Sequence, residues 1–251
     1  MRSGFVAEWP VACARGSSPP AYVRPPSPAT LPRMLPVDSR AAAVRCRALP
    51  SYLWLKSHID GYVALVALTL LAPLLVAIAA VIRRDGHPAI FRQIRAGRGG
   101  RPFTLLKFRT MRPDTHPYGD SPRDGDDPRL TPIGRRLREN SLDELPQIIN
   151  VLRGEMSLVG PRPLYRQQMA EWNERQRGRL AVKPGLTGLA QVQGRGGLTI
   201  EEKLEWDVRY VEQVSLRTDL AIVWQTLARV GRTADIYEVR NSQARRRRGS
   251  D

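Results

Sequence analysis

The chain has 251 residues, which is room for one sizeable domain or two small ones. Its net charge of +16 at pH 7 and its isoelectric point of about 11.0 indicate an anionic partner: nucleic acid, anionic lipid or a phosphorylated substrate. The two cysteines, Cys13 and Cys46, give no sign of a disulfide framework or a metal site, and they fit a reducing compartment.

Residues 1–50 differ in composition from the rest of the chain. Proline-rich runs at 17–20 and 24–28 cannot sustain a helix or a central strand, and few large apolar residues occur at any period. We therefore predict a disordered extension. It is not a good signal peptide, because no apolar core of the right length follows the early charges. A mis-assigned start codon explains the stretch equally well.

Residues 51–84 are predicted to be embedded in a membrane. The uncharged stretch 62–82 is just long enough to cross a hydrocarbon core at about 1.5 Å per residue. Pro73 at its midpoint removes a helix hydrogen bond and kinks the axis, and Thr69 lies where it can help to satisfy freed carbonyls. Because cations flank both ends, we predict a re-entrant helix that bends at Ala72-Pro73 and leaves both ends on the cytoplasmic face. A straight helix with an ordinary proline kink is the alternative.

A polar, arginine-rich region follows. Residues 89–94 and 103–111 predict two strands, and the glycines at 97–100 predict the turn between them, so we expect a β-hairpin. Residues 112–128 contain many Pro, Asp and Gly residues and predict a loop. A helix is expected to resume near residues 132–138.

The chain is organised around residues 138–147. The spacing Ser141-x-x-Glu144 predicts a capping box that opens a helix. Asp143 and Glu144 would then lie in its first turn and point about 100° apart, so that one acid can face a reacting atom while the other faces a metal. Acids are also favoured at helix N-termini by the dipole alone, so a purely structural cap is the alternative. One apolar face is expected behind the dyad: Leu142, Leu145, Ile148, Ile149 and Leu152.

A glycine stop and a stiff loop come next. Residues 153–155 predict the end of the helix. Two prolines, Pro161 and Pro163, fix the backbone around Arg162, whose fork of N–H donors suits a phosphate or a carboxylate. A plain surface arginine in a turn is the alternative for this one residue.

The C-terminal third predicts helices around a glycine-rich stretch. Residues 164–180 predict a polar helix, and the glycines of 183–197 allow the backbone either to approach an anion or simply to turn. Residues 199–213 and 216–230 predict two more helices. The second carries an apolar stripe for which core packing is the default and an interfacial helix is the alternative: Leu216, Leu220, Val223, Leu227 and Val230. A basic tail, residues 240–251, suits anionic lipid or a solvated terminus.

Several motifs, taken in order, resemble the bacterial sugar transferase family, the small monotopic phosphoglycosyl transferases. The resemblance covers about residues 54–238, and although each motif is weak alone, the ordered set is specific. The motifs are Lys56-x-x-x-Asp60, Lys107–Met111, Ser141–Gln147, Val159–Pro163, and Pro184–Gly188 followed by Gln191-Val192-x-Gly194-Arg195. The chain departs from many members of the family in having Ala72 before Pro73, where they have serine, and Leu189, where they have an aromatic residue.

The resemblance implies an enzyme that moves a phosphosugar from a UDP-sugar to a polyprenol phosphate and releases UMP. It assigns Asp143 as the nucleophile that forms an aspartyl-phosphosugar, and Glu144 as a ligand of Mg²⁺. It also implies a cationic pocket for the phosphates, formed by Arg138, Arg162, Lys107, Arg109 and Arg195.

Together these observations predict a mostly helical α+β protein. We expect a disordered extension (1–50), a membrane-embedded re-entrant helix broken at Pro73 (51–84), a cytoplasmic transferase domain with a small β-hairpin and interfacial helices (85–239), and the basic tail (240–251). The expected location is the cytoplasmic face of the membrane, with a UDP-sugar, a polyprenol phosphate and membrane lipid as partners. The motifs leave the sugar and the oligomeric state open.

Two other functions compete with this one. The charge of +16 suggests a nucleic-acid-binding protein, but aromatic residues form only 6% of the chain and no known nucleic-acid motif occurs, so we expect no nucleic-acid partner. A non-catalytic membrane scaffold is the other possibility. In a scaffold, Asp143 and Glu144 would serve only as a helix cap.

Overall fold

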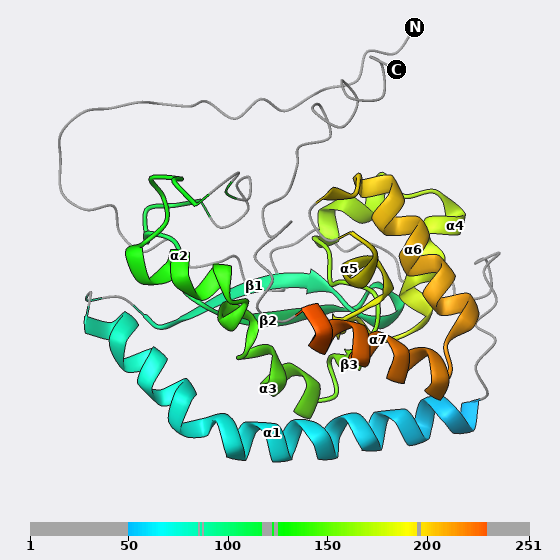
Figure 1. Cartoon of the computed structure of the whole chain (residues 1–251). Helices are drawn as coiled ribbons and strands as arrows, with labels where there is room; N and C mark the ends of the chain where they lie inside the picture. Colours follow the sequence, from blue (N-terminus) through cyan, green and yellow to red (C-terminus); the bar gives the residue numbers. More distant parts are fainter. Residues whose placement is uncertain are drawn as a thin grey trace, which may run out of the picture.

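The computed structural model describes residues 50–84, 86, 88–116, 122, 125–194 and 197–229. The disordered extension and the basic tail expected from the sequence lie outside these residues. Helices dominate the described part, as predicted (Figure 1). The elements in chain order are α1 (Pro50–Arg84), β1 (Ile90–Ala96), η2 (Arg98–Gly100), β2 (Pro102–Phe108), α2 (Pro132–Glu139), η3 (Leu142–Glu144), α3 (Gln147–Leu152), β3 (Ser157–Val159), η4 (Arg166–Ala170), α4 (Glu174–Arg177), η5 (Gly178–Ala181), β4 (Gly185–Thr187), α5 (Leu189–Gln193), α6 (Ile200–Gln213) and α7 (Leu216–Arg229).

The longest element is α1, a helix of 35 residues that is long and apolar enough to cross a membrane. It continues through Pro73 without a break in the helix, and its ribbon bends in its second half (Figure 1). The Thr69 hydroxyl donates to the Leu65 carbonyl oxygen at 3.0 Å. It therefore serves the preceding turn and not the carbonyl that Pro73 leaves free, which is that of Thr69 itself. The re-entrant path stays a prediction.

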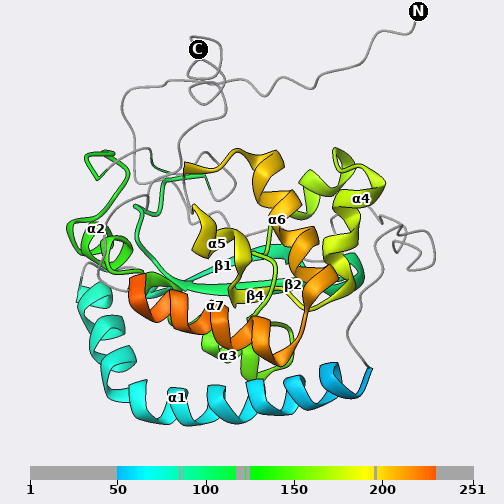
Figure 2. The same cartoon turned by 45° about the vertical axis from the view of Figure 1, so that its right-hand side comes forward.

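One face of α1 belongs to the core of the domain, while most of its apolar surface is exposed. Its N-terminal part packs beside α6 and α7, its middle packs against α3 and β2, and its C-terminal part packs beside the hairpin and α2. In both views α1 lies below the rest of the domain, with α3 and α7 between it and the hairpin (Figures 1 and 2). The α1 residues in these clusters are Tyr52, Leu53, Ala64, Ala67, Leu68, Leu71, Leu75, Ile78, Ala79 and Ile82.

The hairpin predicted from the alternating pattern is confirmed. β1 and β2 pair antiparallel from Ile90↔Phe108 to Ala96↔Pro102. A buried side chain, Asn150 of α3, fixes the helix to this sheet, because its Oδ1 accepts from the Leu106 backbone N–H at 3.0 Å and its Nδ2 donates to a neighbouring carbonyl oxygen at 2.7 Å. The helix that follows the dyad is thereby held against the strand that carries Lys107.

The sequence did not predict a second strand pair, in which β3 and β4 run parallel. The glycines of the 183–197 stretch explain how these strands approach each other. A Cβ on Gly185 would lie 2.1 Å from the Gly160 backbone nitrogen, and a Cβ on Gly188 would lie 2.1 Å from the Gly160 carbonyl oxygen. Any larger residue would force the two chains apart, so these glycines serve close packing of the backbone.

The polar helix expected over 164–180 is wrong, because the segment forms three short pieces, η4, α4 and η5. Side-chain caps divide it. Gln168 Oε1 accepts from the Tyr165 backbone N–H at 3.1 Å, and Asn173 and Gln176 form a reciprocal capping box. These side chains bind backbone N–H groups at the start of a new helix, which interrupts a continuous one.

Helices α6 and α7 confirm the last two predicted helices, but the expected core packing of the α7 stripe is wrong. Leu216, Leu220 and Leu227 are 53–62% exposed, and only Val223 of the described stripe residues is half-buried. Among the described residues of α7, the buried apolar side chain is that of Ile222, and Asp219 is the buried polar one. Val230 lies outside the described residues. The stripe is therefore an exposed apolar face of α7. Trp224 in the same helix is also exposed, at 74%.

Candidate active site

The carboxylate dyad lies in a tight turn between two helices. Ser141 adopts a left-handed conformation, with φ of 56°, and its side chain makes no capping hydrogen bond. The predicted capping box is therefore wrong, since a cap needs an extended backbone at that position. Asp143 and Glu144 instead belong to the short 3-10 helix η3, and α3 begins three residues later at Gln147. This turn packs beside β2, and the Glu144 carboxylate contacts Lys107 of that strand.

The apolar residues behind the dyad only partly form the expected face. Leu142 and Leu145 pack against the cluster around Phe108, and Ile148 is buried. Leu152 is 40% exposed, which contradicts its expected place on the buried side. The difference follows from the change of helix type at Pro146, because residues before and after it do not share one helical phase.

Glu144 is the centre of an ion cluster. Its Oε1 lies 2.7 Å from Lys107 Nζ and 2.9 Å from an Nη2 of Arg162. The lysine comes from β2 and the arginine from the proline-flanked loop after β3. The structure thus brings together three residues that the sequence singled out. Lys107 is 37 positions before Glu144 along the chain, and Arg162 is 18 positions after it.

Asp143 is the more buried acid, with a relative exposure of 7%. Among the described residues, no side chain donates a hydrogen bond to its carboxylate. Burial raises the pKa of Asp143, the neighbouring Glu144 charge adds to that rise, and Lys107, Arg138 and Arg162 oppose it. Nearby cations therefore favour the charged form of this carboxylate.

Glu144 has the opposite electrostatic balance. Burial alone would raise its pKa, but Arg162 and Lys107 together outweigh that effect and hold the pKa of Glu144 well below its usual range. Adjacent acids with pKa values shifted in opposite directions are typical of functional sites in which each acid has a separate task.

The remaining predicted cations divide between the site and its surroundings. Arg138 lies close enough to Asp143 to oppose the rise of its pKa, and its Nε donates to Thr110 Oγ1 at 2.9 Å. Arg109 does not join the cluster: it is buried, and its Nε donates to the Pro88 carbonyl oxygen at 3.0 Å. Arg195 lies outside the described residues. Thr110 was not singled out from the sequence as an orienting residue, although it lies within a motif that was.

Metal binding by the dyad was tested on its donor groups. No group of three or more His, Cys, Asp or Glu side chains gathers anywhere in the described part of the chain. Mg²⁺ does not need such a cage in phosphate sites, where one or two carboxylates together with substrate phosphate and water complete its coordination. The two adjacent carboxylates of Asp143 and Glu144 fit this kind of shared site.

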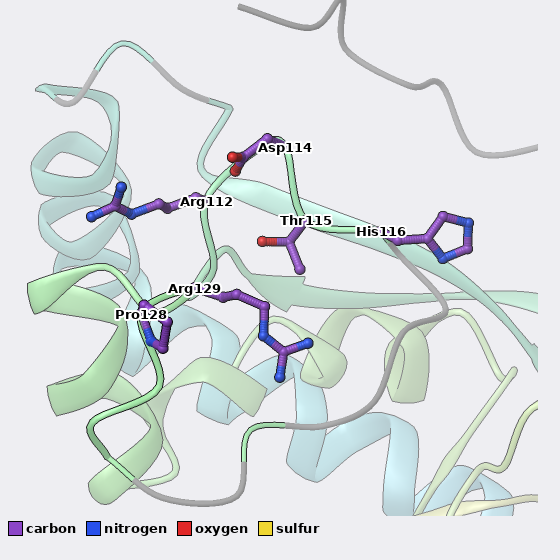
Figure 3. Close-up of a pocket in the computed structure, with 6 residues that line it drawn as sticks. All are labelled: Arg112, Asp114, Thr115, His116, Pro128 and Arg129. Carbon is purple, nitrogen blue, oxygen red and sulfur yellow. The ribbon is translucent and has the colours of Figure 1, made fainter. Parts of the chain in front are cut away.

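A hollow of about 410 Å³ lies in the loop between β2 and α2 (Figure 3). Six residues line it, and two of them are arginines: Arg112, Asp114, Thr115, His116, Pro128 and Arg129. The guanidinium of Arg129 forms an ion pair with Asp127 at 2.6 Å, and its hydrogen bonds lower the pKa of this aspartate to about 2, with a smaller contribution from the charge of Arg138. Of the predicted site residues that the structure describes, none lines the hollow.

The described part of the chain is a mostly helical domain that combines one helix long and apolar enough to cross a membrane with an acid dyad paired with cations. Comparison with known protein families identifies it further. The family model described as bacterial sugar transferase matches residues 51–233, and the chain belongs to this family.

Individual relatives agree with this assignment. The chain is 44% identical over 197 residues to the UDP-glucose:undecaprenyl-phosphate glucose-1-phosphate transferase of Caulobacter vibrioides, covering 72% of each chain. It is 44% identical over 177 residues to the uncharacterized sugar transferase EpsL of Bacillus subtilis, covering 70% of this chain and 87% of the relative. The predicted family and the predicted class, a phosphoglycosyl transferase, are both confirmed.

Some relatives are much longer. The undecaprenyl-phosphate galactose phosphotransferase of Salmonella typhimurium is 36% identical over 199 residues, which cover 73% of this chain but only 42% of that protein. The chain spans a similar share of the galactosyl transferase CpsE of Streptococcus agalactiae, to which it is 40% identical over 189 residues. The shared part in each case includes less than half of the longer protein.

Proposed function

We propose that the protein transfers a phosphosugar from a UDP-sugar to a polyprenol phosphate, releases UMP, and so starts the assembly of a surface polysaccharide or glycoconjugate. The observation that carries this proposal is the unequal acid dyad: Glu144 is paired with two cations, while Asp143 is more buried and accepts no side-chain hydrogen bond from the residues that the structure describes. The relatives named for glucose and galactose transfer to undecaprenyl phosphate support the substrate classes.

In the proposed mechanism a carboxylate oxygen of Asp143 attacks the sugar-bearing phosphorus of the donor. A bond forms between that oxygen and phosphorus, the bond from the phosphorus to the bridging oxygen breaks, and UMP leaves with the bridging oxygen and its electron pair. A phosphate oxygen of the polyprenol phosphate then attacks the same phosphorus. This second step frees the carboxylate and leaves the sugar on a lipid diphosphate.

The cations have the task of lowering repulsion between anionic groups. Both substrates carry negative phosphates, and the nucleophile is itself a carboxylate, so each attack brings like charges together. Lys107, Arg138 and Arg162 supply positive charge around the dyad without a rearrangement of the protein, which is the condition for effective electrostatic stabilisation of a transition state. Arg109 is buried at the base of the hairpin, and its proposed contribution is to the position of β2.

We propose Mg²⁺ as the metal of this site, with Glu144 as its protein ligand together with the donor phosphates. When bound, it would supply positive charge to the diphosphate and make the leaving phosphate a better leaving group. Glu144 Oε1 is occupied by Lys107 and Arg162 in the structure, so the second oxygen of the same carboxylate is the group best suited to such a ligand role.

We propose that α1 is re-entrant, with its bend at Ala72-Pro73, and that the catalytic domain lies on the cytoplasmic face of the membrane. Two observations support a site at a lipid surface. The apolar face of α1 is largely exposed, and α7 exposes Leu216, Leu220 and Trp224. Apolar faces of this kind insert into the boundary between headgroups and acyl chains.

UMP release from a panel of UDP-sugars tests the function. The detergent-solubilised protein would be supplied with Mg²⁺ and a polyprenol phosphate, with UDP-glucose and UDP-galactose tested first. We expect release that needs both lipid and metal and that is lost in Asp143→Asn, while the variant stays folded. Turnover retained by Asp143→Asn would remove the proposed nucleophile.

If a folded protein released UMP from none of the donors, the scaffold function would be favoured. Salt-sensitive binding to nucleic acid would favour the third function.

A further inference from the structure

In the loop that carries Arg162, each backbone carbonyl oxygen of residues 161–164 accepts a hydrogen bond. The carbonyl oxygens of Pro161 and Leu164 accept from the backbone N–H groups of Gly185, at 2.9 Å, and Ala96, at 3.0 Å. Between them, the Pro163 carbonyl oxygen accepts from Arg95 Nη1 at 3.4 Å. The Arg162 carbonyl oxygen accepts from Nη2 of Arg179.

Arg179, whose guanidinium donates to the Arg162 carbonyl oxygen, is itself buried and paired. Its side chain is 2% exposed, and its Nε and Nη2 lie 3.0 Å and 2.6 Å from Oδ2 of Asp207, which is equally buried. Its guanidinium carbon lies 5.0 Å from the centre of the Trp172 ring. A fork of donors is needed here, since one guanidinium serves a carboxylate and a carbonyl together.

The Arg162 side chain continues this chain of contacts into the active site, where Nη2 lies 2.9 Å from Glu144 Oε1. We propose that Arg179, oriented by Asp207, is a positioning residue that fixes the Arg162 guanidinium beside the carboxylate dyad. This inference rests on the proposed function for its effect on turnover, and on the loop contacts alone for its structural part.

The pair is better explained by position than by stability. Buried ion pairs contribute little net stability, because removing two charges from water costs about as much as their attraction returns. An arginine that is already fixed, by contrast, loses little side-chain conformational entropy when a substrate binds. Misplacement of a catalytic group by about 1 Å can reduce a rate about a hundredfold. A buried pair that holds the backbone of a substrate-binding arginine prevents that displacement.

Arg179→Lys tests the proposal in the full-length protein. Lysine keeps the charge opposite Asp207 but cannot also reach the Arg162 carbonyl, so the loop loses one anchor. We expect kcat/KM for the UDP-sugar to fall about tenfold to a hundredfold. The exposed fork of Arg175, which binds Glu205 and Glu212 on the same helix α6, provides a matched control. Arg175→Lys is expected to leave kcat/KM within about twofold.

A double-mutant cycle separates positioning from a general structural effect. If Arg179 acts through the Arg162 guanidinium, Arg179→Lys has nothing further to displace in an Arg162→Ala background, and kcat/KM there should change by less than about twofold. An equal further loss in that background would overturn the proposal. So would a wild-type value of kcat/KM in Arg179→Lys alone.

Amide hydrogen exchange tests the structural part without turnover. We expect the peptide that contains Arg162 and Leu164 to exchange faster in Arg179→Lys and unchanged in Arg175→Lys. Unchanged exchange in Arg179→Lys would overturn the proposal even in an active enzyme. If the wild-type protein released no UMP but the exchange behaved as expected, the anchoring of the loop would stand and the proposed function would fail.

Discussion

Lys107 is expected to control the pH at which the enzyme becomes active. Attack on phosphorus requires the ionised form of Asp143, whose pKa is raised by burial and lowered most strongly, among its neighbouring charges, by Lys107. Lys107→Met removes that charge and keeps most of the side-chain volume. An opposite charge within a few ångströms typically lowers a carboxyl pKa by about one to three units. We therefore expect the pKa of Asp143 to rise by about one to two units in the variant, a free-energy difference of ~1.4–2.7 kcal/mol.

The profile of kcat/KM against pH measures this change, because its acidic limb reports ionisation of the free enzyme. The sign is fixed: activity is lost as pH falls through the pKa of Asp143, so a higher pKa moves the limb to higher pH. Lys107→Arg keeps the charge and should leave the limb in place. An unmoved limb in Lys107→Met, with activity reduced equally at every pH, would refute the reasoning and assign Lys107 a contact with substrate instead.

Three further predictions follow from the site and its surroundings. The folded-state pKa of Asp143 is raised, so ionisation of Asp143 lowers the free energy of unfolding above its unfolded-state pKa. The folded-state pKa of Glu144 is lowered, so ionised Glu144 raises the free energy of unfolding, and this contribution is lost as pH falls. Asp143→Asn should therefore raise the melting temperature at pH 7 by a few degrees and Glu144→Gln should lower it, as measured by calorimetry; shifts of the same sign would contradict this. Arg138→Met should lower kcat/KM for the UDP-sugar at least tenfold, and full retention would place its guanidinium away from the phosphates. In nanodiscs that contain brominated lipid, part of the tryptophan fluorescence should be quenched, and that quenched part should be missing in Trp224→Phe. If α7 faces water, the wild-type protein and Trp224→Phe should show the same quenching.

Regular elements with a local signal were predicted well. The hairpin follows from alternating residues on either side of a glycine turn, and the last helix follows from its apolar spacing. The segment 164–180 was predicted wrongly because side-chain caps, such as that of Asn173, compete with helix continuation and are weak signals in a polar stretch. The β3–β4 pair has only three residues in each strand, so its stability depends on distant partners that no local pattern encodes.

The site shows the same division. Asp143, Glu144, Lys107 and Arg162 were each singled out from motifs, and the structure places the last three in one ion cluster. The left-handed Ser141 was missed, because a serine three residues before a glutamate has the same spacing in a capping box and in this turn. Residues that act on the main chain of other residues, as Arg179 does on Arg162, leave no pattern in the sequence, since their partners are fixed only by folding.

The packing of α1 has a practical consequence for handling this protein. A membrane segment that only tethers a domain can be removed to leave a soluble enzyme. Here the N-terminal, middle and C-terminal parts of α1 each complete a different apolar cluster, and Lys56 of α1 binds Asp219 of α7 at 2.6 Å. Deleting residues 50–84 would expose the undersides of the hairpin and α3 to water and leave Asp219 without its lysine, so the truncated chain should aggregate rather than work in solution.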